Sequence, residues 1–290
     1  MFQKVRVAAI SFVPKKFELE ANSDQLERMF RRAARRGAQV ALGPEGILEG
    51  YVVNELITGE EPTVRMNEVV VTMRGPEIKR FRNLAKELRM CLAFGCAERV
   101  GRNVYNCAVF IDQRGQLCGK YHKMQLAEGS HPSWWFNRLG KKSRAIKTPF
   151  GRCGFLICND RWNPDIARIP VLDGANYLLI PSFGDRSKRQ DEAVLSRAWE
   201  NGVPIVEANV GRTLIINKGK IVAQSRENTK LLFGEIEIPA PPNPTNRDKH
   251  ERSFLRWRRQ EMPLRYRQRL KEFKGKAKAP KRHNQKGRLY

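Results

Sequence analysis

The chain of 290 residues is 41% hydrophobic, 9% aromatic and 29% charged, a composition typical of a soluble globular protein with a sizeable core. No apolar run approaches the roughly 20 residues that a membrane-spanning helix needs, so we expect no membrane association. The six cysteines form no Cys-x-x-Cys pair and the chain has only four histidines, which favours neither a disulfide framework nor a metal site. We therefore expect a reduced cytoplasmic protein without a cofactor.

The net charge of +25 is unevenly distributed along the chain. Residues 243–290 contain 17 lysines and arginines against 4 acidic residues, so one sixth of the chain carries about half of the charge excess. A proline-rich stretch at 239–244 precedes this region and indicates an extended linker. The sequence thus predicts one domain at 1–238, followed at 239–290 by a linker and a basic C-terminal tail.

β-rich runs and amphipathic helices alternate from residue 4 to about 238. Strands are inferred from short apolar runs rich in β-formers, and helices from apolar residues that recur every three or four positions. Their alternation, with hairpins in the middle, predicts an α/β layered domain with a mixed sheet. In chain order we expect a strand at 5–12, a helix from Asn22 or Ser23 to Gly37, a strand at 39–42, a helix from Gly75-Pro76, strands at 91–97, 104–111 and 116–123, a strand ending at Cys158, a helix at 164–173, a strand at 176–180, a helix at 187–201, a strand at 203–208, a hairpin through 217–219 and a last strand at 231–238.

The basic tail divides into two parts. Apolar side chains between Phe254 and Tyr266 are set among arginines, a pattern that fits a short helix laid on the domain. From Lys271 onward Lys, Gly and Pro dominate, and we expect disorder there.

Three short segments carry potential chemistry, and each lies where a predicted strand ends. They are Pro44-Glu45-Gly46, Gly119-Lys-Tyr-His-Lys123 and Gly154-Phe-Leu-Ile-Cys158. Strand ends in α/β folds are where catalytic groups collect. A cysteine nucleophile needs a base to take its proton and a positive charge or N–H donors for the oxyanion, and Glu45 and Lys123 supply these parts. Taken singly each signal is weak, because a thiol after Phe-Leu-Ile usually belongs to a core.

Together and in this order, the segments resemble the nitrilase, or carbon–nitrogen hydrolase, superfamily over residues 4–238. The family's Pro-Glu followed by Gly-Tyr is matched by Pro44-Glu45 and Gly50-Tyr51. Its Gly-(Lys/Arg)-Tyr-(Arg)-Lys motif is matched by 119–123, and its Gly-x-x-Ile-Cys-x-Asp motif by 154–160. The segments 174–182 and 197–202 also look like family segments. The resemblance implies a four-layer α-β-β-α sandwich with mixed β-sheets.

The resemblance also implies a mechanism. Glu45 would take the proton from Cys158, which attacks an amide-like carbon, while Lys123 and the backbone N–H of Asn159 stabilise the oxyanion. Asp160 and Arg161, which follow in the same motif, are candidates for oxyanion or substrate binding. A carboxylate and an ammonium beside the thiol are expected to support thiolate chemistry near neutral pH.

Two departures from the family pattern concern the shape of the site. Family members usually carry a second glutamate between the lysine and the cysteine, and the carboxylate available between Lys123 and Asp160 is Glu128. Counting back from Gly140 points instead to 133–135, so the sequence leaves open whether Glu128 serves. The segment after Gly211 is also shorter than the usual family loop, which predicts a more open or otherwise remodelled site.

Substrate and partners follow from the same resemblance. The Cys-Asn-Asp-Arg run at 158–161 looks like that of N-carbamoyl amino-acid amidohydrolases, which favours a small-molecule amide or ureido substrate over a nitrile. Family members commonly form homodimers or larger homo-oligomers, and the first half of the tail is expected to pack across a subunit interface. The alternative, which we do not favour, is an inactive or weakly active protein that binds RNA or another polyanion through its tail.

Overall fold

The computed structural model describes residues 2–184 and 187–278, which form two β-sheets and their covering helices. The strands are β1 (Gln3–Ser11), β2 (Val40–Leu42), β3 (Cys91–Val100), β4 (Asn103–Ile111), β5 (Leu117–His122), β6 (Ile146–Thr148), β7 (Gly151–Phe155), β8 (Tyr177–Ser182), β9 (Ile205–Asn209), β10 (Thr213–Asn217), β11 (Lys220–Ser225) and β12 (Lys230–Ile238). The helices are α1 (Leu19–Arg35), α2 (Val53–Thr58), α3 (Met66–Val69), α4 (Pro76–Leu88), α5 (Pro164–Leu172), α6 (Lys188–Asn201) and α7 (Asp248–Lys278), with short 3-10 turns at Thr63–Arg65 and Cys158–Trp162.

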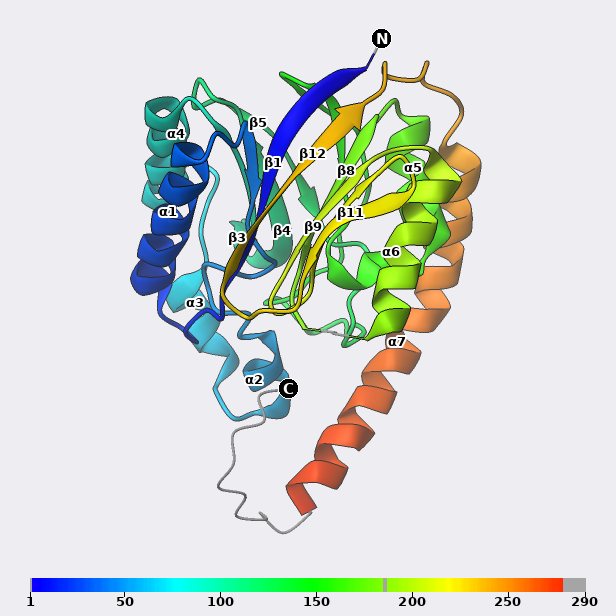
Figure 1. Cartoon of the computed structure of the whole chain (residues 1–290). Coiled ribbons are helices and arrows are strands. Elements are labelled where there is room, and N and C mark those ends of the chain that lie inside the picture. The colour runs from blue at the N-terminus through cyan, green and yellow to red at the C-terminus, as the bar shows by residue number, and fades with distance from the viewer. Residues whose placement is uncertain (1, 185–186, 279–290) are drawn as a thin grey trace.

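The two sheets lie face to face between two outer layers of helices (Figure 1). One sheet has the order β12-β1-β2-β3-β4-β5 and is covered by α1 and α4, and the other has the order β11-β10-β9-β8-β7-β6 and is covered by α5 and α6. Both sheets mix parallel and antiparallel pairs. The predicted four-layer α-β-β-α sandwich is therefore confirmed.

The two sheets also share one pairing pattern. From β12 to β5 the pairs run antiparallel, parallel, parallel, antiparallel, antiparallel, and the same series is found from β6 to β11. The sequence shows no internal repeat, so this duplication is visible only in the structure.

Strand β1 shows why its apolar run is continuous. Val5, Val7 and Ala9 belong to the core between the sheets, whereas Ala8 and Ile10 belong to the core beneath the helices α1 and α4. Side chains alternate across a strand, so a strand buried on both faces needs apolar residues at successive positions. The two buried β-sheets thus hold the ends of their strands in fixed positions, and with them the catalytic candidates that follow these strands.

Gly95 in β3 lets the backbone carrying Glu45 approach the sheet closely. A Cβ at this position would lie 2.6 Å from Glu45 Cα and 2.8 Å from both Gly46 N and Pro44 O. We expect Gly95→Ala to lower the free energy of unfolding by about 1–3 kcal/mol, because the clash is with backbone. Urea denaturation measures the effect, and Gly234→Ala is the matched control, since the atoms nearest to its Cβ would be side-chain atoms of Ile215, at 3.0 Å, and not backbone. Equal stabilities of the two variants would contradict the expectation.

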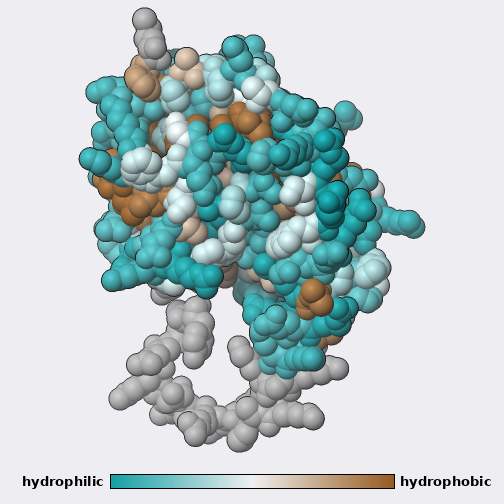
Figure 2. All heavy atoms as spheres, turned by 90° about the vertical axis from the view of Figure 1, so that its right-hand side faces the viewer, coloured by the Kyte–Doolittle hydropathy of each residue, from teal (hydrophilic) through white to brown (hydrophobic). Residues whose placement is uncertain are grey.

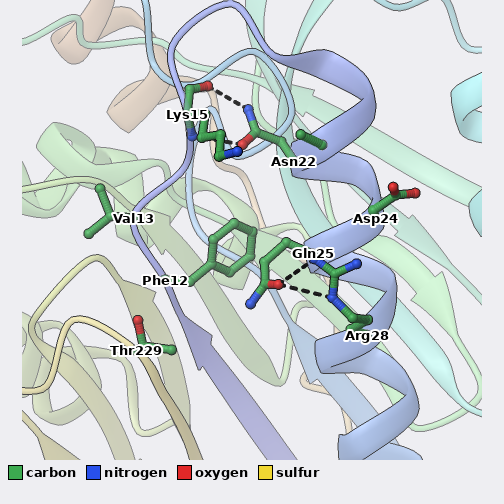
Figure 3. A pocket seen from close by; sticks show the side chains of 9 residues that line it. Phe12, Val13, Lys15, Asn22, Asp24, Gln25, Arg28 and Thr229 are labelled. Carbon is green, nitrogen blue, oxygen red and sulfur yellow. Dashed lines mark hydrogen bonds between the residues drawn. The ribbon is translucent and has the colours of Figure 1, made fainter.

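The first helix begins earlier than its capping signal suggests. It starts at Leu19 rather than after Asn22 or Ser23, and Ser23 Oγ donates to the carbonyl of Leu19. The Asn22 amide instead exchanges hydrogen bonds of 2.7 Å with the backbone N–H and carbonyl of Lys15, as Figure 3 shows in a shallow pocket at this end of the helix. The predicted cap residue therefore fixes the preceding loop, and none of the three chemical segments lines this pocket.

The C-terminal region is helical over a longer stretch than expected. In place of a short helix followed by disorder from Lys271, α7 extends without interruption from Asp248 to Lys278; residues 279–290 lie outside the described part. Phe254 and Met262 are buried against the domain, and α7 lies beside α5 (Figure 1). The division at 238 and 239 and the predicted homo-oligomer stay predictions. Within the residues described, no helix is long and apolar enough to cross a bilayer.

Candidate active site

The three segments at strand ends converge on one buried site. Glu45 follows β2, Lys123 follows β5, and Cys158 follows β7, so the first two come from one sheet and the cysteine from the other. Lys123 Nζ lies 2.6 Å from Glu45 Oε1, and both side chains are completely buried. The Glu45 N–H also donates to the carbonyl of Ser182 in the second sheet, at 3.3 Å. The structure thus brings together the three residues that the sequence predicted as catalytic from their strand ends and from the family resemblance.

Glu45 has one occupied and one free carboxylate oxygen. Its Oε1 accepts from Lys123 Nζ and, at 2.7 Å, from Asn106 Nδ2 in β4. Its Oε2 is buried and has no hydrogen-bond partner among the described residues. A buried polar atom without a partner is costly, which makes such an atom a candidate for contact with a substrate or a reacting group. Asn106 was not singled out from the sequence, where nothing distinguishes it from other polar residues within a strand.

Cys158 occupies a strained position on a tight turn. Its φ angle of 46° lies in the left-handed region, which non-glycine residues rarely adopt, and it begins the turn Cys158–Trp162. The Sγ atom lies 3.6 Å from the carbonyl of Phe183 and accepts from Arg161 Nη2 at 3.2 Å. The turn thus presents the thiol to a guanidinium.

The surroundings of Cys158 shift the pKa of its thiol in opposite directions. Burial raises the pKa of the thiol, the negative charge of Glu45 raises it further, and Lys123 and Arg161 oppose these effects only in part. The resting group is therefore a thiol rather than a preformed thiolate near neutral pH. A nucleophile of this kind needs a base at the moment of attack.

Glu128 also lies within the electrostatic reach of the site. It is buried and accepts a hydrogen bond from Asn137 Nδ2. Burial raises the pKa of its carboxyl, and the Lys123 ammonium opposes that rise. Burial would lower the pKa of Lys123, but Glu45, Cys158 and Glu128 together raise it above its usual range, so the ammonium stays charged. The sequence position that counting back from Gly140 had indicated, 133–135, holds no carboxylate.

Asp160 and Asn159 connect the cysteine turn to the segment after Lys123. The Asp160 carboxylate accepts from Tyr121 Oη at 2.9 Å and from the N–H groups of Ile157 and Gln125 at 2.8 Å. The Asn159 side chain donates to the carbonyl of Gln125 at 3.4 Å. Both oxygens of Asp160 are engaged, which favours a positioning role over contact with substrate.

Arg161 is fully buried and makes contacts in two directions. Its Nε donates to the Cys158 carbonyl at 2.8 Å, and its Nη1 forms an ion pair with the buried carboxylate of Glu207 in β9. Glu207 also accepts from Ser182 Oγ and Gln190 Nε2, both at 2.9 Å. Together with the hydrogen bond from its Nη2 to the Cys158 sulfur, these contacts place Arg161 between the cysteine turn and β9, and its predicted role in oxyanion or substrate binding stays a prediction.

The site is closed rather than open. Cys158 is 7% exposed, and aromatic residues surround this region: Tyr51 stacks on Phe183 with ring centroids 4.5 Å apart, and Trp134 meets Tyr266 of α7 edge to face at 5.1 Å. In addition, Arg258 of α7 donates to the carbonyls of Met124, at 3.3 Å, and Gly140, at 2.5 Å. The more open or otherwise remodelled site expected from the short segment after Gly211 stays a prediction. Helix α7 contacts the segment between Lys123 and Gly140, which carries Glu128.

Glu49 is a buried carboxylate beside the site that the sequence did not identify. It accepts from the N–H of Ala97 at 3.0 Å and lines a small cavity together with Asn106 and Asn137. Burial raises the pKa of Glu49 from 4.5 to about 7. Between these two values the folded state binds more protons than the unfolded state, so this group's contribution to stability falls as pH rises.

We expect Glu49→Gln to flatten this pH dependence. From pH 5 to pH 8 the native chain should lose up to about 3 kcal/mol of unfolding free energy that the variant does not lose. Urea denaturation of both proteins at the two pH values measures the difference. The same loss in both proteins would show that Glu49 is not the titrating group.

A second ionic cluster lies on β3, β4 and β5. Ligand atoms of Glu98, Cys107 and His122 lie within 4.8 Å of one another, a spacing compatible with a metal ion. However, Glu98 is already bonded to Lys120 and, at 2.5 Å, to His122, whose ring stacks on Tyr105. We interpret the cluster as an ion pair network that fixes the strand leading into Lys123.

Comparison with known proteins agrees with this fold. Residues 6–240 match the carbon-nitrogen hydrolase family, and the chain therefore belongs to this family. With its fold and its relatives, it is an amidase-type hydrolase. The predicted superfamily membership is confirmed.

Individual relatives extend the comparison. An N-carbamoylputrescine amidase from Oryza sativa subsp. japonica is 30% identical over 252 residues, covering 82% of this chain and 79% of the relative. A probable nitrilase from Schizosaccharomyces pombe is 26% identical over 245 residues, covering 81% and 86%. Among solved structures, an amidase from Nesterenkonia sp. superposes with a TM-score of 0.69 at 20% identity, covering 86% of this chain and 96% of that one. This last likeness concerns the fold.

Proposed function

We propose that the protein hydrolyses a linear amide or an N-carbamoyl compound through a thioester on Cys158. Glu45 Oε2 takes the thiol proton as the sulfur attacks the carbonyl carbon, and an S–C bond forms. Lys123 Nζ and the Asn159 N–H stabilise the resulting oxyanion. Glu45 returns its proton to the leaving nitrogen as the C–N bond breaks, which leaves an acyl or carbamoyl thioester.

The second half of the reaction reuses the same carboxylate. Glu45 takes a proton from a water molecule, whose oxygen attacks the thioester carbon. The S–C bond breaks, Cys158 recovers a proton, and the acid product leaves. Microscopic reversibility makes one residue act as base and acid in turn.

The observation that carries this proposal is that the two carboxylate oxygens of Glu45 have different surroundings. One oxygen is held by Lys123 and Asn106, while the other is buried and unpartnered among the described residues. The carboxylate is thus fixed in orientation and still able to exchange a proton. The raised pKa of Cys158 supports the same assignment, because a thiol needs such a base.

Two observations support the proposed substrate class. Asn159-Asp160 after the cysteine and the similarity to N-carbamoylputrescine amidases support a ureido or amide group. Ammonia release from N-carbamoyl amino acids, N-carbamoyl amines and short linear amides, with matched nitriles in parallel, tests it. Turnover of nitriles alone, or of none of these compounds by folded protein, would contradict the assignment.

Glu128 is proposed as the second carboxylate of the site, which orients Lys123. Glu128→Gln keeps the shape and removes the charge, so we expect a fall in kcat of about 10²–10³-fold, the scale on which oxyanion stabilisation acts. Steady-state kinetics measure it. Glu251→Gln on α7, whose carboxylate pairs with Arg144 at 2.9 Å, is the control and should retain kcat. An unchanged kcat in Glu128→Gln would remove it from the site.

A further inference from the structure

The outward face of α7 carries a row of unpaired cations. The row consists of six exposed residues, Lys249, Arg252, Arg256, Arg259, Arg267 and Lys271. At 100° per residue they fall within an arc of about 120° on the helix surface. Within residues 2–184 and 187–278, none of the six has a carboxylate within 4.0 Å. Unpaired like charges along one face repel one another, so the row suits an anionic partner.

The docking of α7 holds this row toward solvent. Phe254 and Met262 are buried against the domain, and Arg258 is anchored to the carbonyls of Met124 and Gly140. The helix therefore cannot turn its cations inward without losing these contacts. Figure 2, which looks onto the side that carries α7, shows a mainly hydrophilic surface.

The acidic residues of α7 do not neutralise the row. Three of its carboxylates are engaged elsewhere: Glu251 with Arg144 at 2.9 Å, Glu261 with Arg265 at 2.5 Å, and Glu272 with Arg269 at 2.9 Å. These pairs use cations outside the row. Counted over its sequence, the helix has 12 basic and 4 acidic residues, so it stays strongly positive.

An aromatic ring lies among the cations at the N-terminal half of the row. An open groove is lined by Lys249, Arg252, Arg256, the partly exposed Trp257, and two polar residues, Ser253 and Gln260. Cations interleaved with an aromatic ring and amide or hydroxyl groups are typical of surfaces that bind phosphates and stack bases.

We propose that this face of α7 binds the phosphate backbone of a nucleic acid. From Lys249 to Lys271 the row is about 33 Å long at 1.5 Å per residue, a length over which a nucleic acid presents many phosphates. Insertion into a membrane is disfavoured, because an interfacial helix needs a continuous apolar face and Leu264 is the one exposed large apolar residue on the described part of α7. The binding is independent of the proposed hydrolysis.

The test is the salt dependence of binding by the full chain. Fluorescence anisotropy with a labelled 20-nucleotide single-stranded RNA, and in parallel a 20-base-pair DNA duplex, should give log K against log salt with a slope of about −4 for the RNA and about −5 for the duplex. Between 50 and 200 mM salt the RNA affinity would then fall about 250-fold. The nucleic acid that binds with the higher affinity at the same salt concentration is the preferred one.

Two triple variants localise the binding. Arg252→Gln, Arg256→Gln and Arg259→Gln together should reduce the RNA slope by about 2, because three phosphate contacts are removed. The control replaces the exposed Arg28, Arg32 and Arg35 of α1, on the opposite outer layer, with glutamine, and so makes the same change in net charge. Thermal melting by circular dichroism checks that both variants fold.

Three results would overturn the proposal. The first is equal RNA slopes for the α7 and α1 variants, which would assign binding to net charge alone. The second is an absence of salt-dependent binding by the native chain. The third is binding to poly-glutamate or to vesicles containing phosphatidylglycerol that is as tight, per unit charge, as binding to RNA.

Discussion

Replacing Cys158 with alanine will lower the turnover of any amide or ureido substrate by about 10⁴-fold or more, because no bond to the substrate carbon can then form. Alanine leaves the volume and the turn nearly unchanged, so the variant should remain folded. The fall should appear in kcat, with little change in substrate affinity. Steady-state ammonia release measures it.

The double variant Cys158→Ala with Glu45→Gln is the decisive control for a shared mechanism. Groups that act as one unit are strongly non-additive, so the second substitution should cost almost nothing further. Glu45→Gln alone should lower kcat by at least about 10³-fold, since the amide keeps the hydrogen bonds of Oε1 but cannot accept a proton. Losses that simply multiply in the double variant would mean that the two residues act independently.

Arg161→Met will give the largest loss of stability that we expect from a single substitution at the site. The change removes the ion pair between Arg161 and the buried Glu207 carboxylate, which also accepts hydrogen bonds from Ser182 and Gln190. Removing one partner of a buried pair costs about 3–5 kcal/mol, because the remaining charge is desolvated. Urea denaturation at pH 7 measures the unfolding free energy.

Two further variants test whether the loss of unfolding free energy comes from burial of the unpaired charge or from the number of ion pairs removed. Adding Glu207→Gln to Arg161→Met should recover much of the loss, because the buried charge is then gone. Arg80→Met is the surface control: Arg80 pairs with Glu20, Asp24 and Glu27 and is 29% exposed, so we expect a loss of about 1 kcal/mol or less. A larger loss for Arg80→Met than for Arg161→Met would contradict this account.

The sequence predicted those parts of the fold that depend on local pattern. Strands β3, β4 and β5 lie close to the predicted ranges, because each is a β-rich apolar run that ends in turn residues. The start of α1 was wrong, since the Asn22 side chain bonds to the Lys15 backbone and not to the helix end. The extent of α7 was also underestimated, because its stability comes from docking of Phe254 and Met262, which composition does not reveal.

Some residues of the candidate site could be predicted from the sequence and others could not. Glu45, Lys123 and Cys158 could be selected because each follows a strand within a recognisable segment. Asn106 could not, because its contact with Glu45 depends on how β4 pairs with its neighbours. The direction of the Cys158 pKa could not be predicted for a similar reason: neighbouring charges can be inferred from motifs, but the extent of burial cannot.

The most direct test of the central claim, that Glu45 activates Cys158, is the rate of alkylation of each cysteine by iodoacetamide, a small amide-shaped electrophile. Peptide mass spectrometry can follow all six cysteines at pH 7 in the native chain and in Glu45→Gln. We predict that Cys158 reacts first although it is buried, ahead of the more exposed Cys118, and that Glu45→Gln slows only Cys158, by about tenfold or more. Faster alkylation of Cys118, or a Cys158 rate unchanged by Glu45→Gln, would contradict the account.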